Sequence, residues 1–214
     1  MYSADLSGHE CTGADMKITR AQVQANRARV VETASMLFRE RGYDGIGVAD
    51  LMKAAGLTHG GFYKHFGSKT DLMAESAACG MAQTVALTAG MDPAAFVRSY
   101  LSREHRDARA NGCTIAALGA DAARQPAAVR ASFAAGIESM LAAQVCGAAP
   151  AAREGASHVR ANAIDTMAHA VGAIVLSRAC PDDSPLADEI LTVCRDAILA
   201  SLNPPVQSSD AVRP

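Results

Sequence analysis

The chain has 214 residues and a mass of 22.1 kDa, and half of its residues are hydrophobic while a fifth are charged, which excludes a wholly disordered or collagen-like protein. Only 4% of the residues are aromatic and none is Trp, a composition that favours close-packed helices over sheets. The net charge of −2 excludes a uniformly basic coat for nucleic acids.

The charge is distributed unevenly along the chain. Residues 16–75 carry nine Lys or Arg against six Asp or Glu, a net charge of +3, whereas the other residues carry eleven against sixteen, a net charge of −5. A basic segment of this kind is compatible with a nucleic-acid-binding head and equally with a solvated surface. The six widely spaced cysteines contain no C-x-x-C pair, so we expect no zinc site, no redox dithiol and no cofactor.

Both ends of the chain are predicted to be tails. Residues 1–15 are polar and aperiodic, and residues 204–214 contain prolines without periodicity. Met16 is a second candidate for the start of translation. No run of about 18 apolar residues predicts a membrane span, and the acidic amino terminus is not typical of a signal peptide, so we expect a cytoplasmic protein.

Between the tails, the apolar residues recur at helical spacing almost throughout. The predicted head consists of a helix over 30–41 ended by Gly42, a helix over 48–55, a turn over 56–58 and a helix over 59–66 capped by Thr58. The predicted trunk consists of a helix from Lys69, capped by Ser68, to about Gly90, followed by helices over 93–109, 113–124, 126–146, 157–180 and 186–202.

The fold class is therefore predicted to be all-α, with a three-helix head on a six-helix trunk. No strand alternation and no internal repeat is present in the sequence. We place the boundary inside the long helix after Lys69, so that residues 16–70 form the head and residues 71–203 form the trunk.

Residues 47–66, GVADLMKAAGLTHGGFYKHF, combine two short helices with a three-residue turn that contains Gly. This spacing predicts a helix-turn-helix. Adjacent glycines at 60 and 61 would let the second helix bring its backbone close to base pairs, and polar side chains would surround them. The alternative is a purely structural helix-turn-helix, which leaves the polar residues of this stretch unexplained. Phe62, Phe66 and Leu72 are predicted to be core residues.

Two runs of residues carry a family resemblance. A-x-x-L-F-x-x-x-G-Y spans Ala34–Tyr43, and A-A-G-L-T-x-G-x-F-Y-x-H-F-x-S-K-x-x-L spans Ala54–Leu72. Together they resemble the TetR family of bacterial transcriptional regulators. The resemblance implies a DNA-binding head in which Thr58 touches phosphate, His59, Gly60, Gly61 and Lys64 face base edges, and Tyr63, His65 and Lys69 hold the DNA backbone.

The sequence departs from the family pattern at two places. Ile46 and Gly47 stand where the family usually has Thr followed by Ser or Thr, so Gly47 would cap its helix without a hydroxyl group for phosphate. Gly61 stands where Thr is common, which puts one base contact in doubt. Basic residues before the first predicted helix, Lys17, Arg20, Arg27 and Arg29, would either extend the DNA footprint or form a solvated face.

The resemblance also implies a trunk that dimerises and holds a small-molecule effector. Small and apolar residues share stripes on the last two predicted helices, where two copies would form a four-helix interface: Ile164, Ala168, Val171, Gly172, Val175, Ile190, Val193, Cys194 and Ala197. A palindromic operator needs two reading heads one helical turn of DNA apart. The alternative for these residues is the core of a single chain.

The effector chamber is expected among the helices over residues 69–147. Candidate lining residues, each of which also suits an ordinary core position, are Met81, Val85, Phe96, Tyr100, Leu101, Cys113, Ala117, Phe133, Ile137, Met140 and Met167. Cys113 starts a predicted helix, where the helix dipole favours a thiolate. We therefore consider it a candidate for a thiol that responds to oxidants or electrophiles, the alternative being a small buried hydrophobic residue.

We expect a homodimeric repressor that a small-molecule effector, oxidising or electrophilic if Cys113 is its target, releases from a palindromic DNA operator. The sequence leaves activation open as well. An enzyme is not expected, because no nucleophile–base constellation, phosphate-binding glycine loop or metal-ligand spacing appears. A DNA-binding protein without an effector, and therefore with a collapsed trunk, is the remaining alternative.

Overall fold

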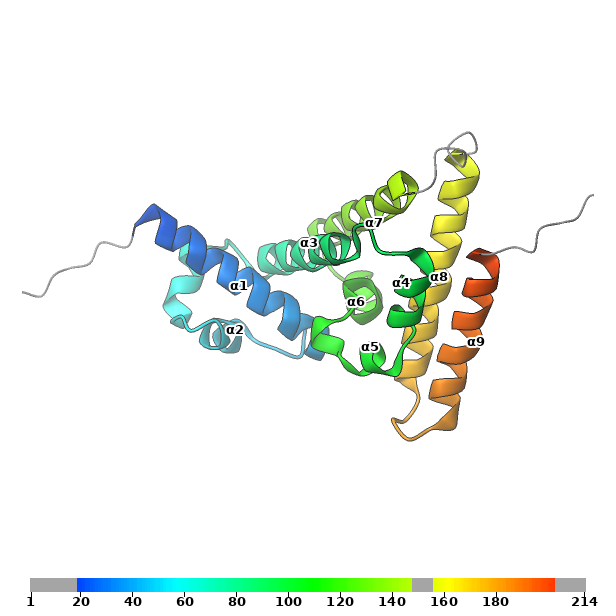
Figure 1. Ribbon diagram of the computed structural model, residues 1–214. Coiled ribbons are helices and arrows are strands. Elements are labelled where there is room, and N and C mark those ends of the chain that lie inside the picture. The colour runs from blue at the N-terminus through cyan, green and yellow to red at the C-terminus, as the bar shows by residue number, and fades with distance from the viewer. Residues whose placement is uncertain (1–18, 148–155, 203–214) are drawn as a thin grey trace, which may run out of the picture.

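The computed structural model describes residues 19–147 and 156–202, and within this part of the chain every regular element is a helix. Figure 1 shows a head at one end and a pair of long helices, α8 and α9, at the other. The predicted all-α class is confirmed. Both predicted tails, Lys17 and most of the predicted loop over 147–155 lie outside the described residues.

The head contains α1 (Arg20–Arg41), α2 (Val48–Ala54) and η1 (His59–Lys64). Gly42 ends α1 with a φ of 76°, as predicted for a glycine C-cap. The third element differs from the prediction because η1 is a 3₁₀-helix rather than an α-helix. Two adjacent glycines disfavour an α-helix, and the Thr58 side chain makes no capping hydrogen bond.

The trunk is formed by the remaining helices, α3 (Lys69–Thr88), α4 (Pro93–Tyr100), α5 (Arg103–Asp107), η2 (Arg109–Asn111), α6 (Thr114–Ala122), α7 (Ala127–Gly147), α8 (Ala156–Ala179) and α9 (Pro185–Leu202). Ser68 caps α3 as predicted, with its Oγ accepting from the Asp71 N–H at 3.1 Å. The predicted helix over 93–109 is instead broken after Tyr100. The Ser102 Oγ accepts from the His105 N–H, which starts α5 separately.

Two hydrophobic clusters hold the molecule together. The first joins the head to α3, α6 and α7 across residue 70, and contains Phe62, Phe66 and Leu72 as predicted. The second lies deeper in the trunk and joins α4 and Cys113 to α8 and α9. The head is thus packed directly onto the trunk, because one continuous core includes residues from both. No helix in the described part of the chain combines the length and apolar character that a membrane span requires.

Candidate functional site

The exposed side of η1 is the most distinctive surface of the head. Phe62 is fully buried, whereas the next side chain, Tyr63, is 71% exposed. Thr58, His59, Gly60 and Lys64 are also exposed. The short helix is therefore anchored by one aromatic ring and presents a phenol, an imidazole and an ammonium group to solvent.

Gly60 is not required by the fold of the chain. An added Cβ at Gly60 would meet no atom within 4 Å, and at Gly61 it would make only ordinary contacts of 3.6 Å to Met52 and 3.7 Å to Thr58. Neither glycine has a positive φ. Because internal packing would accept a larger residue at Gly60, the absence of a side chain leaves room for something outside the chain.

Two other residues predicted to bind DNA, Lys69 and His65, have contacts within the head, whereas Gly47 is exposed. The Lys69 ammonium group donates to the Tyr43 carbonyl at 2.6 Å and lies 5.9 Å from the Phe38 ring centroid. His65 is half-buried, and its carbonyl accepts from the Arg27 guanidinium group. Gly47 is the exposed N-cap of α2 and has no side chain to cap it. Lys69 and His65 therefore also hold the head together.

The amino-terminal half of α1 carries two exposed arginines, Arg20 and Arg29. Arg27 differs from them because it forms an ion pair with Glu75 of α3 and lies 4.9 Å from the Phe66 ring centroid. Of the basic residues predicted to extend the footprint, Arg27 is thus engaged inside the molecule, whereas Arg20 and Arg29 face solvent.

A small chamber of about 30 Å³ lies between α4, α7, α8 and the start of α6. Its lining includes five of the predicted ligand residues, Phe96, Tyr100, Cys113, Met140 and Met167. Sequence reasoning missed Val97, Gln144, Thr166 and Ala170, and assigned Val171 to the dimer interface. Gln144 follows Met140 by one helical turn, a spacing that was available in the sequence.

The other predicted ligand residues do not line this chamber. Ala117 and Phe133 pack in or against the first hydrophobic cluster, and Leu101 is fully buried in the second. Val85 and Ile137 are half-buried on α3 and α7. Met81 lines a separate groove of about 220 Å³ between α3 and α7.

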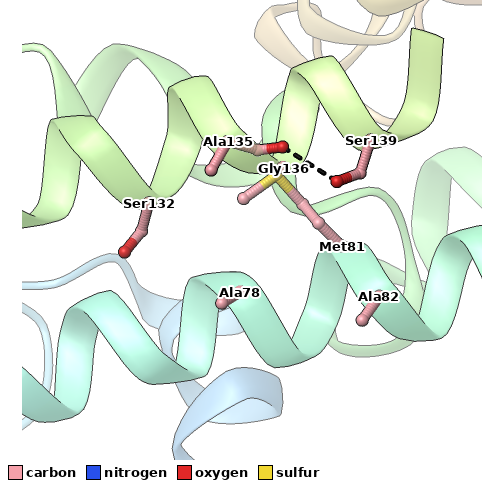
Figure 2. Close-up of a pocket in the computed structure, with 7 residues that line it drawn as sticks. All are labelled: Ala78, Met81, Ala82, Ser132, Ala135, Gly136 and Ser139. Atoms are coloured by element: carbon pink, nitrogen blue, oxygen red, sulfur yellow. Dashed lines mark hydrogen bonds between the residues drawn. The ribbon is translucent and has the colours of Figure 1, made fainter. Parts of the chain in front are cut away.

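Figure 2 shows that this α3–α7 groove is formed by small side chains on two facing helices. The two helices approach closely at Gly136, where an added Cβ would lie 2.3 Å from the Met81 sulfur. The Ser139 hydroxyl donates to the Ala135 carbonyl of its own helix at 3.0 Å. The chamber contains five of the predicted ligand residues and the groove only one, so we regard the chamber as the stronger candidate for a ligand site.

Polar groups gather beside the chamber. The His105 ring lies 4.5 Å from the Tyr100 ring, its Nδ1–H donates to the Tyr100 carbonyl at 2.7 Å, and its Nε2 accepts from the Cys113 N–H at 3.2 Å. Burial lowers the pKa of His105, and the Arg178 charge adds to this, against the opposing bond to the carbonyl. Burial also raises the pKa of Tyr100 well above its usual value. Both rings are therefore uncharged at neutral pH.

A buried arginine connects the head to the wall of the chamber. Arg39 of α1 donates from Nε to the Ala110 carbonyl at 2.7 Å, and from Nη1 to Ser35 at 2.8 Å and to Thr114 at 3.3 Å. Burial lowers the pKa of Arg39. Thr114 directly follows Cys113, which lines the chamber, so the chamber wall is adjacent in sequence to a residue that bonds to a head helix.

The outer side of α8 and α9 is an exposed apolar surface, which we call the α8–α9 face. Its exposed large hydrophobic residues are Ile164, Val175, Leu176, Leu186 and Val193. Of the other residues predicted for the interface, Ala168 and Ala197 are exposed and Gly172 is half-buried. Val171, Ile190 and Cys194 instead pack against the second core cluster.

Comparison with known proteins matches the head most strongly. A family model described as bacterial regulatory proteins, tetR family, matches residues 30–76. The HTH-type transcriptional regulator AcrR of Shigella flexneri is 35% identical over 57 residues, which are 27% of this chain and 26% of AcrR. The match thus spans about a quarter of the length of the curated relatives.

Solved structures match over most of the chain. A TetR transcriptional regulator of Chloroflexus aurantiacus has a TM-score of 0.66 at 23% identity, covering 85% of this chain and 96% of that one. The reduced form of E. coli NemR has a TM-score of 0.65 at 18% identity, covering 81% and 95%. At these identities the likeness shows a shared fold.

Proposed function

We propose that the chain is a homodimeric, DNA-binding transcriptional regulator of the TetR family, controlled by a small molecule. The match of residues 30–76 to the model of bacterial regulatory proteins, tetR family, supports this proposal. In this proposal, residues 16–70 bind DNA, whereas residues 71–203 dimerise and hold the effector. The observation that carries the proposal is the exposed side of η1, where polar side chains surround a glycine that the fold does not require.

The DNA contacts follow from this surface. Because neither Gly60 nor Gly61 has a side chain, η1 can bring its backbone against base edges. His59 and Lys64 would donate hydrogen bonds to the same edges. Tyr63 and Thr58 are exposed beside these residues and would bond to phosphate oxygens. Lys69 would add positive charge from α3 while its ammonium group keeps the bond to Tyr43. Arg20 and Arg29 would lengthen the phosphate footprint.

A dimer would place two such heads on one operator. The α8–α9 face exposes several large apolar side chains on two adjacent helices, and apolar patches of this kind favour association. An added Cβ at Gly172 would meet no atom of its own chain within 4 Å. Gly172 and Ala168 would therefore let a partner helix approach closely in a four-helix interface.

Effector binding would act by selecting one conformation of the trunk. A ligand shifts such an equilibrium only by its difference in affinity for the two states. The chamber wall at Cys113 is joined through Thr114 and Arg39 to α1, and α3 runs from the head along the trunk (Figure 1). We infer that a ligand widening the chamber would shift the heads out of operator register and so relieve repression.

Cys113 offers an oxidising or electrophilic effector a target in the same chamber. The thiol is free, 3% exposed and part of the chamber lining. Modification would add bulk at the residue next to Thr114, which bonds to the head. A Cys113→Ser variant should then bind DNA normally and lose its response to hydrogen peroxide and N-ethylmaleimide. An unchanged response in gel-shift titrations would contradict this role.

A second candidate function is DNA binding without an effector. It is favoured by the size of the chamber, because about 30 Å³ has room for about one or two water molecules. The two candidates differ in whether any small molecule releases the protein from DNA.

The experiment that tests the proposed function is selection of DNA from a random pool by the full chain, followed by gel-shift titration. We expect enrichment of a palindromic site, and a loss of affinity of about tenfold or more in Lys64→Ala. The control Lys53→Ala removes an exposed lysine of α2 that we do not assign to DNA. Selection that returns no common sequence would contradict a sequence-specific regulator.

A further inference from the structure

Two buried hydrogen-bond donors beside the chamber have no partner in the described part of the chain. They are the Tyr100 hydroxyl group and the Arg178 Nη1. Tyr100 lines the chamber and is only 8% exposed. An unpaired buried polar group is costly, and natural structures contain few of them. Two in one neighbourhood indicate that a missing acceptor belongs there.

The charge of Arg178 is also uncompensated. Its Nε donates to the Arg106 carbonyl at 2.8 Å and its Nη2 to the His105 carbonyl at 3.1 Å, so both known acceptors are neutral. No carboxylate of the described residues forms an ion pair with Arg178. Burial lowers its pKa, as expected for a cation without a counter-ion.

The neighbouring Arg106 is a buried arginine whose charge is paired with carboxylates of the same chain. Arg106 is 1% exposed and pairs with Asp107 at 2.5 Å and with Asp182 at 3.0 Å. The same region thus supplies two carboxylates to one arginine and none to the other. A carboxylate from outside the chain would complete the second.

Arg178 does not line the chamber but lies near it on α8. It follows Val171 of the chamber lining by seven residues, about two helical turns, so the two residues share a stripe of α8. An added Cβ at Gly112, the residue before Cys113, would lie 3.2 Å from the Arg178 Nη2. The Arg178 charge opposes the rise in the pKa of Tyr100, so these two side chains lie near each other.

We propose that the chamber binds an organic monocarboxylate, with the acid group accepting from the Tyr100 hydroxyl and the Arg178 Nη1 and an apolar body among α4, α7 and α8. This inference rests on the proposed function in that it names the class of effector. Amines are disfavoured by the charge of Arg178. The chamber must widen, and Met140 and Met167 are half-buried, flexible side chains that can move to make the room.

The test is isothermal titration calorimetry of the full chain at pH 7.5 with octanoate, decanoate, 4-butylbenzoate and 2-naphthoate, each paired with its primary amide. We expect at least one acid to bind about tenfold or more tightly than its amide, because a hydrogen bond to a charged group strengthens binding by about this factor. The Tyr100→Phe variant should lose about tenfold in affinity for that acid, and Arg178→Met should lose its preference for acid over amide.

Two controls separate the site from general damage. Arg160→Met removes an exposed arginine of the same helix that pairs with Glu138, and it should keep the preference for the acid. Tyr100→Phe removes a buried hydroxyl group without a hydrogen-bonded N or O partner among residues 19–147 and 156–202, so without ligand its melting temperature should equal or exceed that of the wild type. The Tyr100→Phe variant therefore still tests the proposal if Arg178→Met does not fold.

The inference is overturned if no acid binds more tightly than its amide, or if the preference survives in both Tyr100→Phe and Arg178→Met. Gel shifts with the selected DNA separate this failure from failure of the proposed function. A protein that binds its operator but shows no preference for acids disproves the monocarboxylate alone. If the protein prefers acids but recognises no DNA sequence, the monocarboxylate site is supported and the proposed regulatory function is disproved.

Discussion

At the scale of single residues, two groups have roles that packing alone does not explain. Gly60 lies in a helix without any neighbour that would prevent a larger side chain. His105 is half-buried between a carbonyl acceptor and an N–H donor, a pairing that requires a neutral imidazole. Gly60 leaves room for a binding partner outside the chain. The hydrogen bonds of His105 keep its own imidazole neutral beside the chamber. Each leads to a prediction that separates stability from function.

Replacement of Gly60 by Ala should stabilise the fold and weaken DNA binding. Alanine restricts the unfolded chain at a position with no positive φ, so we expect about 0.4–1 kcal/mol of added stability. The added methyl group would at the same time lie between η1 and the DNA, so affinity should fall. Urea unfolding and gel-shift titration measure the two effects. A variant that binds DNA as well as the wild type would show that Gly60 does not approach the bases.

The pH dependence of stability should contain a contribution from His105. Because burial lowers the pKa of His105 in the folded protein, the unfolded chain takes up the proton first as the pH falls. The contribution is complete above the unfolded pKa of about 6.5 and is lost below it, towards the lowered folded pKa. Between pH 7.5 and 5.5 we expect a loss below about 1.4 kcal/mol.

Urea unfolding at both pH values, with His105→Gln as the comparison, measures this contribution. Glutamine has one donor and one acceptor group but does not titrate, so the variant should lose less stability on acidification than the wild type. Equal losses in the two proteins would mean that His105 is not held neutral.

At the scale of elements, the helices α1, α3 and α6 are tightly packed where they meet at Gly80. An added Cβ at Gly80 of α3 would lie 2.4 Å from both the Arg39 Nη1 and the Thr114 Oγ1, and 2.8 Å from the Ser35 Oγ. These side chains are held by hydrogen bonds to one another. Three elements therefore meet around a single missing side chain.

We predict that Gly80→Ala lowers the free energy of unfolding by about 1–3 kcal/mol, because overpacking displaces the bonded side chains. Gly119→Ala in α6 is the matched control. An added Cβ there would make only an ordinary contact of 3.7 Å to Ile115, so helix propensity should make that variant as stable as the wild type or more so. If urea unfolding showed the same change in the free energy of unfolding for both variants, the close contacts around Gly80 would not be its cause.

The sequence predicts most elements because their signals are local. Ser68 and Gly42 mark helix ends through their own chemistry. The break after Tyr100 was not predictable from periodicity, since Val97, Tyr100 and Leu101 keep an apolar spacing while all three are buried. The contact between Arg39 and Thr114 joins residues 75 positions apart, and Arg178 reaches His105 across 73. Such pairings arise only in the folded chain.

At the scale of the whole molecule, the head and the helices α8 and α9 lie at opposite ends of the molecule (Figure 1). The head packs onto the trunk through one continuous hydrophobic cluster, so a rotation of the trunk would carry the head with it. In a dimer built on the α8–α9 face, small changes in each trunk would alter the distance between the two heads. Recognition of two half-sites depends on that distance.

Replacement of Val193 by Glu should convert the dimer to a monomer while the chain stays folded. Val193 is 60% exposed at the centre of α9, so its replacement removes no contact of the protomer core, whereas a carboxylate buried between two copies would be unpaired and costly. Met36→Glu, on the exposed side of α1, introduces the same charge in the head and should leave the dimer intact. Sedimentation velocity measures the assembly and circular dichroism the folding. If Val193→Glu remained dimeric, the partner contact would lie elsewhere. If it became monomeric and still bound a palindromic site with unchanged affinity, the two heads would not be reading the operator together.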